Sequence, residues 1–359
     1  MGGQGFIDSE LGEERRVKSY SRREVIRLFG VAGAAAAWLP ERVFAERVEQ
    51  AKVILGDGVH KYEWLQGWAK LPEGMKYVGS THGNVQVDSK DRVFFNTDTE
   101  NAVMIFEPDG TFVKSWGKEF KGGSHGMKIA TEGGKEVLWL CHLGRSEVVK
   151  CTLDGEVLLT IPYPEMSGVY KSKGEYKPTG VAIGPTGDVY VGDGYGKSWC
   201  HQWTAKGEYV RSWDGSEREK GKLSTPHGIC LDLRGGTPLL IVADRSNHRI
   251  QVFGLDGKFV SEATEGMRNP CTVNVLGSDL IIPDLQGRIT ILNKDNKLVA
   301  HLGENSDPKK RGNFNVAPED WKDGEFTAPH GACWDSKGDL YVEDWNKSGR
   351  VNKLRRVKE

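Results

Sequence analysis

The sequence lacks the motifs of several common protein classes. Its 359 residues include six cysteines, and no two of them form a Cys-x-x-Cys pair, so neither a zinc ribbon nor a thioredoxin-like site is expected. No Gly-x-Gly-x-x-Gly motif follows a strand pattern and opens a helix, which argues against a dinucleotide-binding domain. The net charge is only −1. That charge provides no long-range attraction to nucleic acid, so we expect no nucleic-acid partner.

The residues that are present indicate a β-rich protein. There are 46 glycines, which predict many turns, and 11 tryptophans, which suit large packing positions in sheets. The length allows one large domain or two ordinary ones.

The N-terminal segment, residues 1–45, differs from the rest. Ser-Arg-Arg-Glu-Val-Ile-Arg at residues 21–27 precedes an apolar run at 28–39, and Val-Phe-Ala at 43–45 is an acceptable cleavage site. The apolar run is too short and too rich in Ala and Gly for a transmembrane helix. The segment resembles a twin-arginine export signal and predicts a periplasmic or extracellular protein that meets the membrane only transiently. The alternative is that this segment forms a basic amphipathic helix. The predicted domain comprises residues 46–359.

Six units of similar pattern follow one another along that domain. Each contains short stretches of alternating apolar and polar residues and tight turns such as Asp-Gly. Repeats of roughly 40–50 residues with four short strands are typical of β-propellers. The sequence therefore predicts an all-β fold, a six-bladed β-propeller, and we expect a monomer. The units open at residues 81–83, 124–126, 178–180, 227–228, 269–271 and 328–331.

The sixth unit ends after about three strand patterns, by the four-strand rule for propeller blades. A spare strand pattern lies upstream of the first unit, at Tyr62–Trp68. We predict that this N-terminal strand completes the last blade and closes the ring, because closure removes open sheet edges.

One position recurs at the start of the first strand of each unit. The innermost strand of a propeller blade lines the central channel, so these positions should form a ring. In chain order they are His82, His125, Thr179, His227, Cys271 and His330.

Three of these histidines fall on alternate units, which lie about 120° apart around a six-bladed ring. His125, His227 and His330 therefore predict a tripod of imidazoles for a metal ion with an open coordination position. Zinc is the expected metal, and other first-row transition metals also accept imidazole. His82 is a fourth ligand, a base or a channel residue. The alternative is a structural or water-filled channel in which His-Gly serves only a tight strand entry.

The ends of the second strands should surround the same ring, because they return to the face where the first strands begin. Aspartates recur there, and we expect their side chains to bond to the backbone of turns. They are Asp193, Asp244, Asp284 and Asp344.

The stretch Ile-Val-Ala-Asp-Arg-Ser-Asn-His-Arg-Ile at residues 241–250 resembles NHL-repeat six-bladed propellers. Residues 177–183, 189–195, 225–228 and 242–253 resemble, more closely, the propeller of peptidyl-α-hydroxyglycine α-amidating lyase. That resemblance implies zinc on the three histidines, and a small-molecule or peptide substrate whose carbinolamine C–N bond is cleaved to an amide and glyoxylate.

The same resemblance assigns the catalytic tyrosine of an Asp-Gly-Tyr motif to Tyr195. Two departures from the family are visible. The family has an aspartate linked to calcium after its last zinc histidine, where this chain has Gly331, and its active-site arginine has no clear counterpart.

Two hypotheses follow. The first is an exported, zinc-dependent lyase that uses Tyr195 and His82 beside the tripod. The second is a non-catalytic NHL-type propeller that binds a protein or a glycan through the same face.

Overall fold

The structure is a computed structural model that describes residues 51–217 and 221–358. This part of the chain contains strands and short 3-10 helices and no α-helix. Nor does it contain a helix that is long and apolar enough to cross a membrane. The predicted export signal at residues 1–45 lies outside the described residues and stays a prediction.

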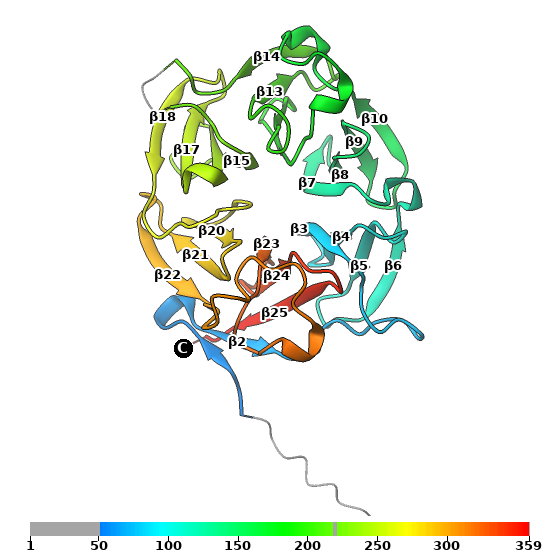
Figure 1. Cartoon of the computed structure of the whole chain (residues 1–359), viewed down its shortest axis with the longest axis vertical. Coiled ribbons are helices and arrows are strands. Elements are labelled where there is room, and N and C mark those ends of the chain that lie inside the picture. Colours follow the sequence, from blue (N-terminus) through cyan, green and yellow to red (C-terminus); the bar gives the residue numbers. More distant parts are fainter. Residues whose placement is uncertain (1–50, 218–220, 359) are drawn as a thin grey trace, which may run out of the picture. The chain divides into compact units, whose positions relative to one another are not determined.

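The strands form six antiparallel sheets around a central axis, which is the predicted six-bladed β-propeller (Figure 1). In five of the sheets the strands follow one another in chain order from the axis outward, and in the sixth the two outermost strands come from the start of the described chain. The first three sheets consist of β3 (Thr81–Val87), β4 (Val93–Thr97), β5 (Val103–Phe106) and β6 (Phe112–Trp116); β7 (Ser124–Glu132), β8 (Lys135–His142), β9 (Glu147–Thr152) and β10 (Val157–Ile161); and β11 (Gly180–Ile183), β12 (Val189–Gly192), β13 (Cys200–Trp203) and β14 (Tyr209–Trp213).

The other three sheets continue around the axis. They consist of β15 (Pro226–Asp232), β16 (Leu239–Asp244), β17 (Arg249–Gly254) and β18 (Phe259–Ala263); β19 (Asn274–Leu276), β20 (Asp279–Asp284), β21 (Arg288–Leu292) and β22 (Leu298–Leu302); and β23 (Pro329–Trp334), β24 (Leu340–Asp344), β25 (Arg350–Arg356), β2 (Tyr62–Leu65) and β1 (Ile54–Leu55). The 3-10 helices are η1 (Gly58–His60), η2 (Lys118–Phe120), η3 (Glu165–Ser167), η4 (Lys173–Glu175), η5 (Arg245–Asn247) and η6 (Pro318–Asp320).

The last sheet contains both ends of the described chain. β2 pairs antiparallel with β25, with Trp64 opposite Leu354, so the upstream strand is the fourth strand of the sixth sheet as expected. The strand is shorter than predicted, because it ends at Leu65. Trp68 nevertheless stays buried, with its ring 5.1 Å from the ring of Tyr341. The contribution of β2 to closing the ring stays a prediction.

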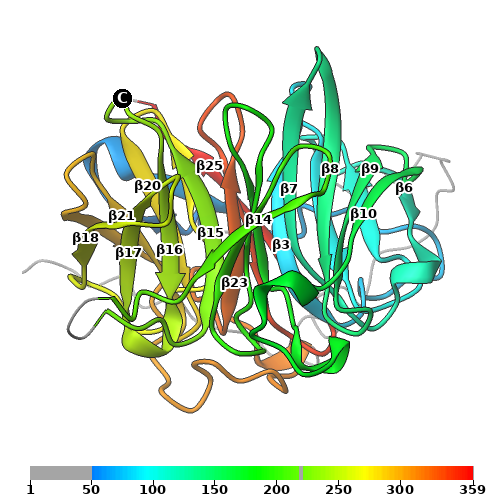
Figure 2. The same ribbon diagram turned by 90° about the horizontal axis from the view of Figure 1, so that it is seen from above.

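A separate apolar cluster lies between each pair of neighbouring sheets. For example, Val85 of β3 and Tyr341 of β24 belong to the cluster between the first and the last sheet. Each sheet is therefore buried on both faces, which explains why strands such as Val103–Phe106 are apolar throughout. Side on, the inner strands β23, β3 and β7 run next to one another along the axis (Figure 2).

Tight turns between strands fix the register of the hairpins. Gly110 of the Asp-Gly turn after β5 has a φ of 85°, and a Cβ atom there would lie 1.8 Å from the carbonyl oxygen of Trp68. Only glycine fits both demands. The turn thus also supports Trp68, the buried tryptophan that follows β2.

Candidate functional site

Four histidines from four different sheets meet at the axis. The rings of His125, His227 and His330 form a triangle, with ring centroids 4.8 Å, 4.9 Å and 4.7 Å apart. His82 lies beside this triangle, 4.7 Å from His125 and 5.1 Å from His330. The structure thus brings together the four histidines that the repeat pattern placed at equivalent positions.

A β-bulge orients the side chains of His125, His227 and His330. The register of the inner strand shifts between Ser124 and Met127, between Pro226 and Gly228, and between Pro329 and Gly331. A bulge inserts an extra residue and reorients its side chain. The histidine of each strand is the residue so displaced.

The glycine that follows each histidine has a steric reason. A Cβ atom on Gly126 would lie 2.3 Å from the carbonyl oxygen of Thr179, and one on Gly228 would lie 2.5 Å from that of Cys271. The backbone of the next sheet therefore passes directly over the glycine. The glycine permits this close approach, and the histidine before it makes a hydrogen bond to the same neighbouring sheet.

Each of the three imidazoles donates its Nδ1 hydrogen to a backbone carbonyl of the next sheet. The Nδ1–O distances are 2.8 Å from His125 to Thr179, 3.0 Å from His227 to Cys271 and 2.6 Å from His330 to Gly83. A carbonyl can only accept, so Nδ1 carries the proton and Nε2 keeps its lone pair. Such outer bonds fix the tautomer and orientation of metal-binding histidines.

The electrostatics keep these rings neutral. Burial, with added repulsion from neighbouring histidines and Arg245, lowers the pKa of His125, His227 and His330 well below the usual range for histidine. Neutral imidazole is the form that binds metals. Nε2 of His125 and Nε2 of His330 are buried and have no hydrogen-bond partner in the structure.

Potential ligand atoms converge in two overlapping sets of three, and in each set all atoms lie within 4.8 Å of one another. One set is His82, His125 and His330, and the other is His227, Cys271 and His330. His330 belongs to both. The donors suit zinc or another transition metal, and two orphaned buried nitrogens are positions that a metal ion would satisfy.

Tyr195 lies at the edge of the histidine ring, in the turn after β12. Its Oη is 2.9 Å from Nε2 of His227 and 3.2 Å from Nε2 of His82. Because Nε2 of His227 has only a lone pair, the hydroxyl donates to His227 and accepts from His82. The position that the family resemblance assigns to Tyr195 is thus in direct contact with the ring.

Arg245 is a member of the site to which sequence analysis assigned no role. Its Nη1 donates to Oη of Tyr195 at 3.2 Å, and its guanidinium carbon lies 5.1 Å from the centre of the tyrosine ring. Burial raises the pKa of Tyr195, and Arg245 acts in the opposite direction. Arg245 directly follows the aspartate at the end of β16, so its place after a second strand was the available signal.

The recurring aspartates hold the loops that lead into the inner strands. Asp244 accepts from the backbone nitrogen of Ser224 at 2.7 Å, and Asp344 accepts from that of Ala328 at 2.8 Å. Asp193 accepts from the backbone of Lys177 at 2.7 Å in the same way. The expected turn-bonding role is confirmed at these positions, and the bonds lie a few residues before each ring position.

Thr179 and Cys271 occupy the remaining ring positions, and both lie just before the inner strands of their sheets. Thr179 lies one residue before β11, and Cys271 lies before β19. The carbonyls of both residues orient His125 and His227, and the thiol of Cys271 also belongs to one of the two ligand sets.

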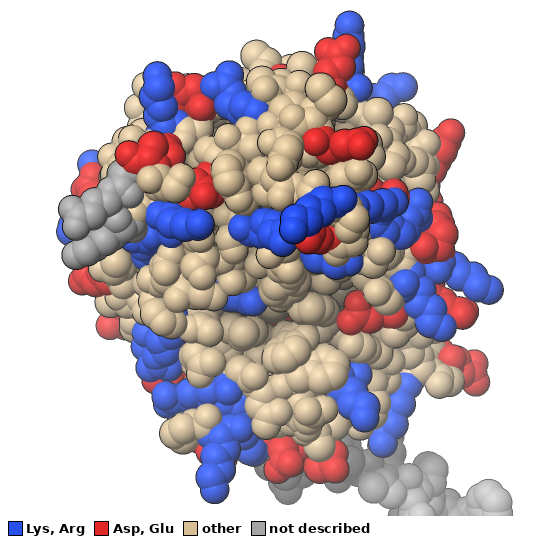
Figure 3. Space-filling view, turned by 45° about the horizontal axis from the view of Figure 1, so that its top comes forward, with Lys and Arg blue, Asp and Glu red and all other residues tan. Residues whose placement is uncertain are grey.

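The long connection at residues 303–327 also reaches the site. The ring of its Phe314 lies 4.9 Å from that of Trp345, which lies 5.8 Å from His82. In the space-filling view, the centre of the propeller is hollowed and Lys and Arg side chains form a band beside the hollow (Figure 3). Elsewhere on this face, acidic and basic side chains are mixed.

A calcium ion after the last histidine does not fit. Gly331 provides no side-chain oxygen, and a Cβ atom there would lie 2.6 Å from Cα and 2.8 Å from Oδ1 of Asn84. The amide of Asn84 instead donates to the carbonyl of Met127 at 3.1 Å. The calcium that the resemblance implied therefore has no carboxylate ligand at this position.

Known proteins resemble the chain in sequence and in fold. The family model for the NHL repeat matches residues 223–253. The chain is 33% identical over 171 residues to peptidylglycine alpha-amidating monooxygenase of Rattus norvegicus, a match that covers 45% of this chain and 17% of that protein. It is 28% identical over 209 residues to peptidyl-alpha-hydroxyglycine alpha-amidating lyase 1 of Drosophila melanogaster, which covers 54% of this chain and 36% of that protein.

The chain thus spans well under half the length of either protein. Among solved structures, a streptogramin B lyase matches with a TM-score of 0.55 at 16% identity, over 79% of this chain and 95% of that one. At this identity the likeness concerns the fold alone. Together, these findings show a six-bladed propeller with one NHL-repeat match at residues 223–253 and a distant sequence similarity to amidating enzymes.

Proposed function

We propose that the protein is a zinc-dependent lyase that cleaves the C–N bond of a carbinolamine, in which one carbon carries a hydroxyl group and an amide nitrogen. The observation that carries this proposal is the ring itself: His125, His227 and His330 share one orientation and keep their Nε2 lone pairs. The similarity to a Drosophila protein named as an amidating lyase supports the choice of reaction.

The proposed substrate is a small molecule or peptide that ends in an α-hydroxyglycine. The basic side chains beside the central hollow suit the carboxylate of such a group (Figure 3). When bound by the three imidazoles, zinc would polarise the substrate oxygen and favour loss of its proton.

Tyr195 would receive that proton. The Nε2 lone pair of His227 can serve either the Tyr195 hydroxyl or a metal ion, so metal binding would release the hydroxyl from His227. Oη of Tyr195 would then be flanked by donors from Arg245 and His82, both at 3.2 Å. Two donors and a nearby positive charge favour the phenolate and offset the effect of burial.

The bond changes balance without a further reactant. The hydroxyl proton moves to Tyr195, the C–O bond becomes a carbonyl, and the electron pair of the C–N bond leaves with the amide nitrogen. Tyr195 then returns its proton to that nitrogen. The products are an amide and an aldehyde, which is glyoxylate when the carbon carries a carboxylate. His82 remains neutral, because burial lowers its pKa to about 4, and it acts as a hydrogen-bond donor to Tyr195.

The test measures zinc content and lyase turnover of the folded full-length chain with an N-acyl-α-hydroxyglycine as substrate. We expect about one zinc ion per chain and turnover in the wild type, and neither in His227→Ala. His301→Ala is the matched control, because His301 is a half-buried histidine of the outer strand β22 and should retain both.

Each contrary outcome has a definite meaning. Zinc with no turnover would reject the reaction and keep the metal site. Absence of zinc from the wild type after zinc has been supplied would reject the metal site as well. The non-catalytic binding propeller would then be the better hypothesis.

A further inference from the structure

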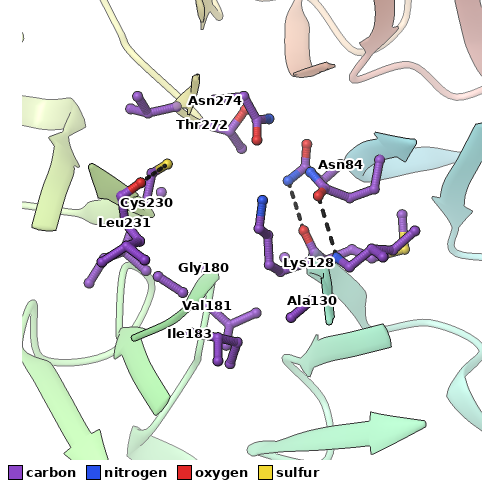
Figure 4. Close-up of a pocket in the computed structure, with 18 of the residues that line it drawn as sticks. Asn84, Lys128, Ala130, Gly180, Val181, Ile183, Cys230, Leu231, Thr272 and Asn274 are labelled. Carbon is purple, nitrogen blue, oxygen red and sulfur yellow. Dashed lines mark hydrogen bonds between the residues drawn. The ribbon is translucent and has the colours of Figure 1, made fainter. Parts of the chain in front are cut away.

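The central channel continues beyond the histidine ring as a cavity of about 170 Å³. Its walls come from the inner strands of five sheets, and Figure 4 shows their side chains around the axis. A cavity of about 150 Å³ in another protein is large enough to hold benzene, so a ligand of several heavy atoms fits here.

Lys128 is the charged residue of this cavity. It lies three residues after His125, and its side chain extends into the space between the sheets (Figure 4). Cys230 lies three residues after His227 and lines the same cavity.

The ammonium group of Lys128 has no anionic partner in the cavity wall. Among the described residues that line the cavity, none is aspartate or glutamate. The thiol of Cys230 does not compensate either, because burial raises its pKa, although Lys128 acts in the opposite direction. Lys128 is half-buried, and a nearby counter-charge stabilises a charge that is partly removed from water.

Neutral hydrogen-bond donors accompany Lys128. The amide of Asn84 donates one hydrogen to Met127 O at 3.1 Å, and that of Asn274 donates one to Ala332 O at 2.5 Å. An amide NH₂ group has two hydrogens, so each asparagine retains a second one. Both asparagines line the same cavity as Lys128 (Figure 4).

We propose that this cavity binds a small monovalent anion of the carboxylate or halide class, with Lys128 as its charged partner and Asn84 and Asn274 as neutral donors. The site is separate from the proposed zinc position, and it does not depend on the lyase activity. It also explains why none of the described residues that line this part of the channel is acidic: the counter-charge comes from solution.

The test is calorimetric titration of the full-length protein with sodium acetate and, separately, with sodium chloride, in a buffer of large organic anions. We expect saturable binding of at least one of the two. Acetate alone would identify a carboxylate site, and chloride alone would identify a halide site. Lys128→Met should bind the anion at least about tenfold more weakly, as for loss of a charged hydrogen bond.

Lys135→Met is the matched control. Lys135 begins the next strand of the same hairpin and is exposed, so this variant loses the same charge and should keep wild-type affinity. Asn274→Asp is a second variant that keeps Lys128 and places a carboxylate in the cavity, and it should also lose binding. Absence of binding of either anion to the wild type, or equal affinity in Lys128→Met, would overturn the proposal.

Discussion

The six sheets divide into two sets that alternate around the axis. The sheets that begin with β7, β15 and β23, here called the ligand sheets, each carry a histidine at a bulge followed by glycine. The sheets that begin with β3, β11 and β19, here called the acceptor sheets, provide the carbonyls to which those histidines donate. Side-chain chemistry is constant in the first set, and backbone chemistry is constant in the second.

This difference explains the variation at the ring positions. A carbonyl acceptor is available from any residue, so the acceptor sheets can carry histidine, threonine or cysteine there: His82, Thr179 and Cys271. A ligand sheet cannot vary in this way, because both the imidazole and the glycine beside it have geometric tasks. The alternation of ligand sheets and acceptor sheets thus follows from the hydrogen bond between imidazole and backbone carbonyl, which occurs three times around the ring.

The largest effect is expected from exchanging histidine for alanine in the two sets. His330→Ala should reduce bound zinc from about one ion per chain to almost none, because a tripod with two ligands no longer provides three protein donors. His82→Ala, from an acceptor sheet, should retain the zinc. Elemental mass spectrometry of both variants decides the matter. Equal loss in the two variants would show that all four histidines act as one set.

Tyr195→Phe should lower turnover by about 10²- to 10⁴-fold, the usual contribution of a positioned acid or base. The zinc content should not change, because the proposed tripod consists of three imidazoles that are each oriented by a backbone carbonyl and not by Tyr195. Steady-state kinetics with parallel metal analysis is the measurement, and Tyr209→Phe, which removes a hydroxyl from the outer strand β14, is the control. Turnover close to that of the wild type would move the base to another residue.

The sixth sheet is the ligand sheet that depends on a strand from the other end of the chain. Trp64 of β2 is 4% exposed and packs 5.0 Å from Phe326. Trp64→Ala should reduce the free energy of unfolding by about 3–5 kcal/mol, as for other large-to-small core changes. Denaturant unfolding, with the exposed Val113→Ala as control, measures this. A loss no greater than that of Val113→Ala would mean that β2 adds little to the propeller.

Glu343 lies at the contact between the last ligand sheet and the first acceptor sheet. Its Oε1 accepts from the backbone nitrogen of Gly83 at 3.0 Å, and its Oε2 is buried without a partner. Burial raises the pKa of Glu343 well above the usual range for glutamate. The folded protein therefore holds this proton after the unfolded chain has lost it, and stability falls as the pH rises between the two values.

Glu343→Gln mimics the protonated form and should raise the melting temperature at neutral pH, with a difference that shrinks toward about pH 4, near the ordinary carboxyl pKa. Glu304→Gln is the control with the opposite sign, because Arg268 and neighbouring arginines lower the pKa of Glu304. That variant should lose stability at neutral pH. A pH-independent effect of Glu343→Gln would contradict the assigned protonation state.

The smallest effect is expected from Cys271→Ala. The carbonyl of Cys271 orients His227, and this substitution leaves the carbonyl in place. We expect unchanged zinc content and a stability loss on the order of 1 kcal/mol. Because the Cys271 thiol also belongs to one of the two ligand sets, loss of zinc in this variant would assign the metal to that set instead of the tripod.

The sequence was informative where a property repeats at fixed intervals. Alternating apolar residues and Asp-Gly turns identified the six sheets, and the upstream strand at Tyr62 was recognised because the last unit was one strand short. The four histidines were found together because they occupy one repeat-equivalent position. Tyr195 came from a family motif, and the structure places it against the ring.

Arg245, Asn84 and Lys128 could not be assigned in this way, because each acts on a residue from another sheet. Arg245 reaches Tyr195 across a sheet boundary, and Asn84 occupies the space beside Gly331. The sequence around Arg245 or Asn84 does not indicate which residue of the neighbouring sheet it contacts. The channel cavity around Lys128 likewise exists only once five inner strands surround it.

The sequence by itself thus determined the propeller, the alternation of histidines and the glycine beside each of them, because these depend on local periodicity and on residue type. The tertiary structure alone decided which carbonyl orients each imidazole, which arginine meets the tyrosine and where an unmatched ammonium group points. Those relations join residues far apart in the chain, and their geometry is fixed only when neighbouring sheets pack against one another.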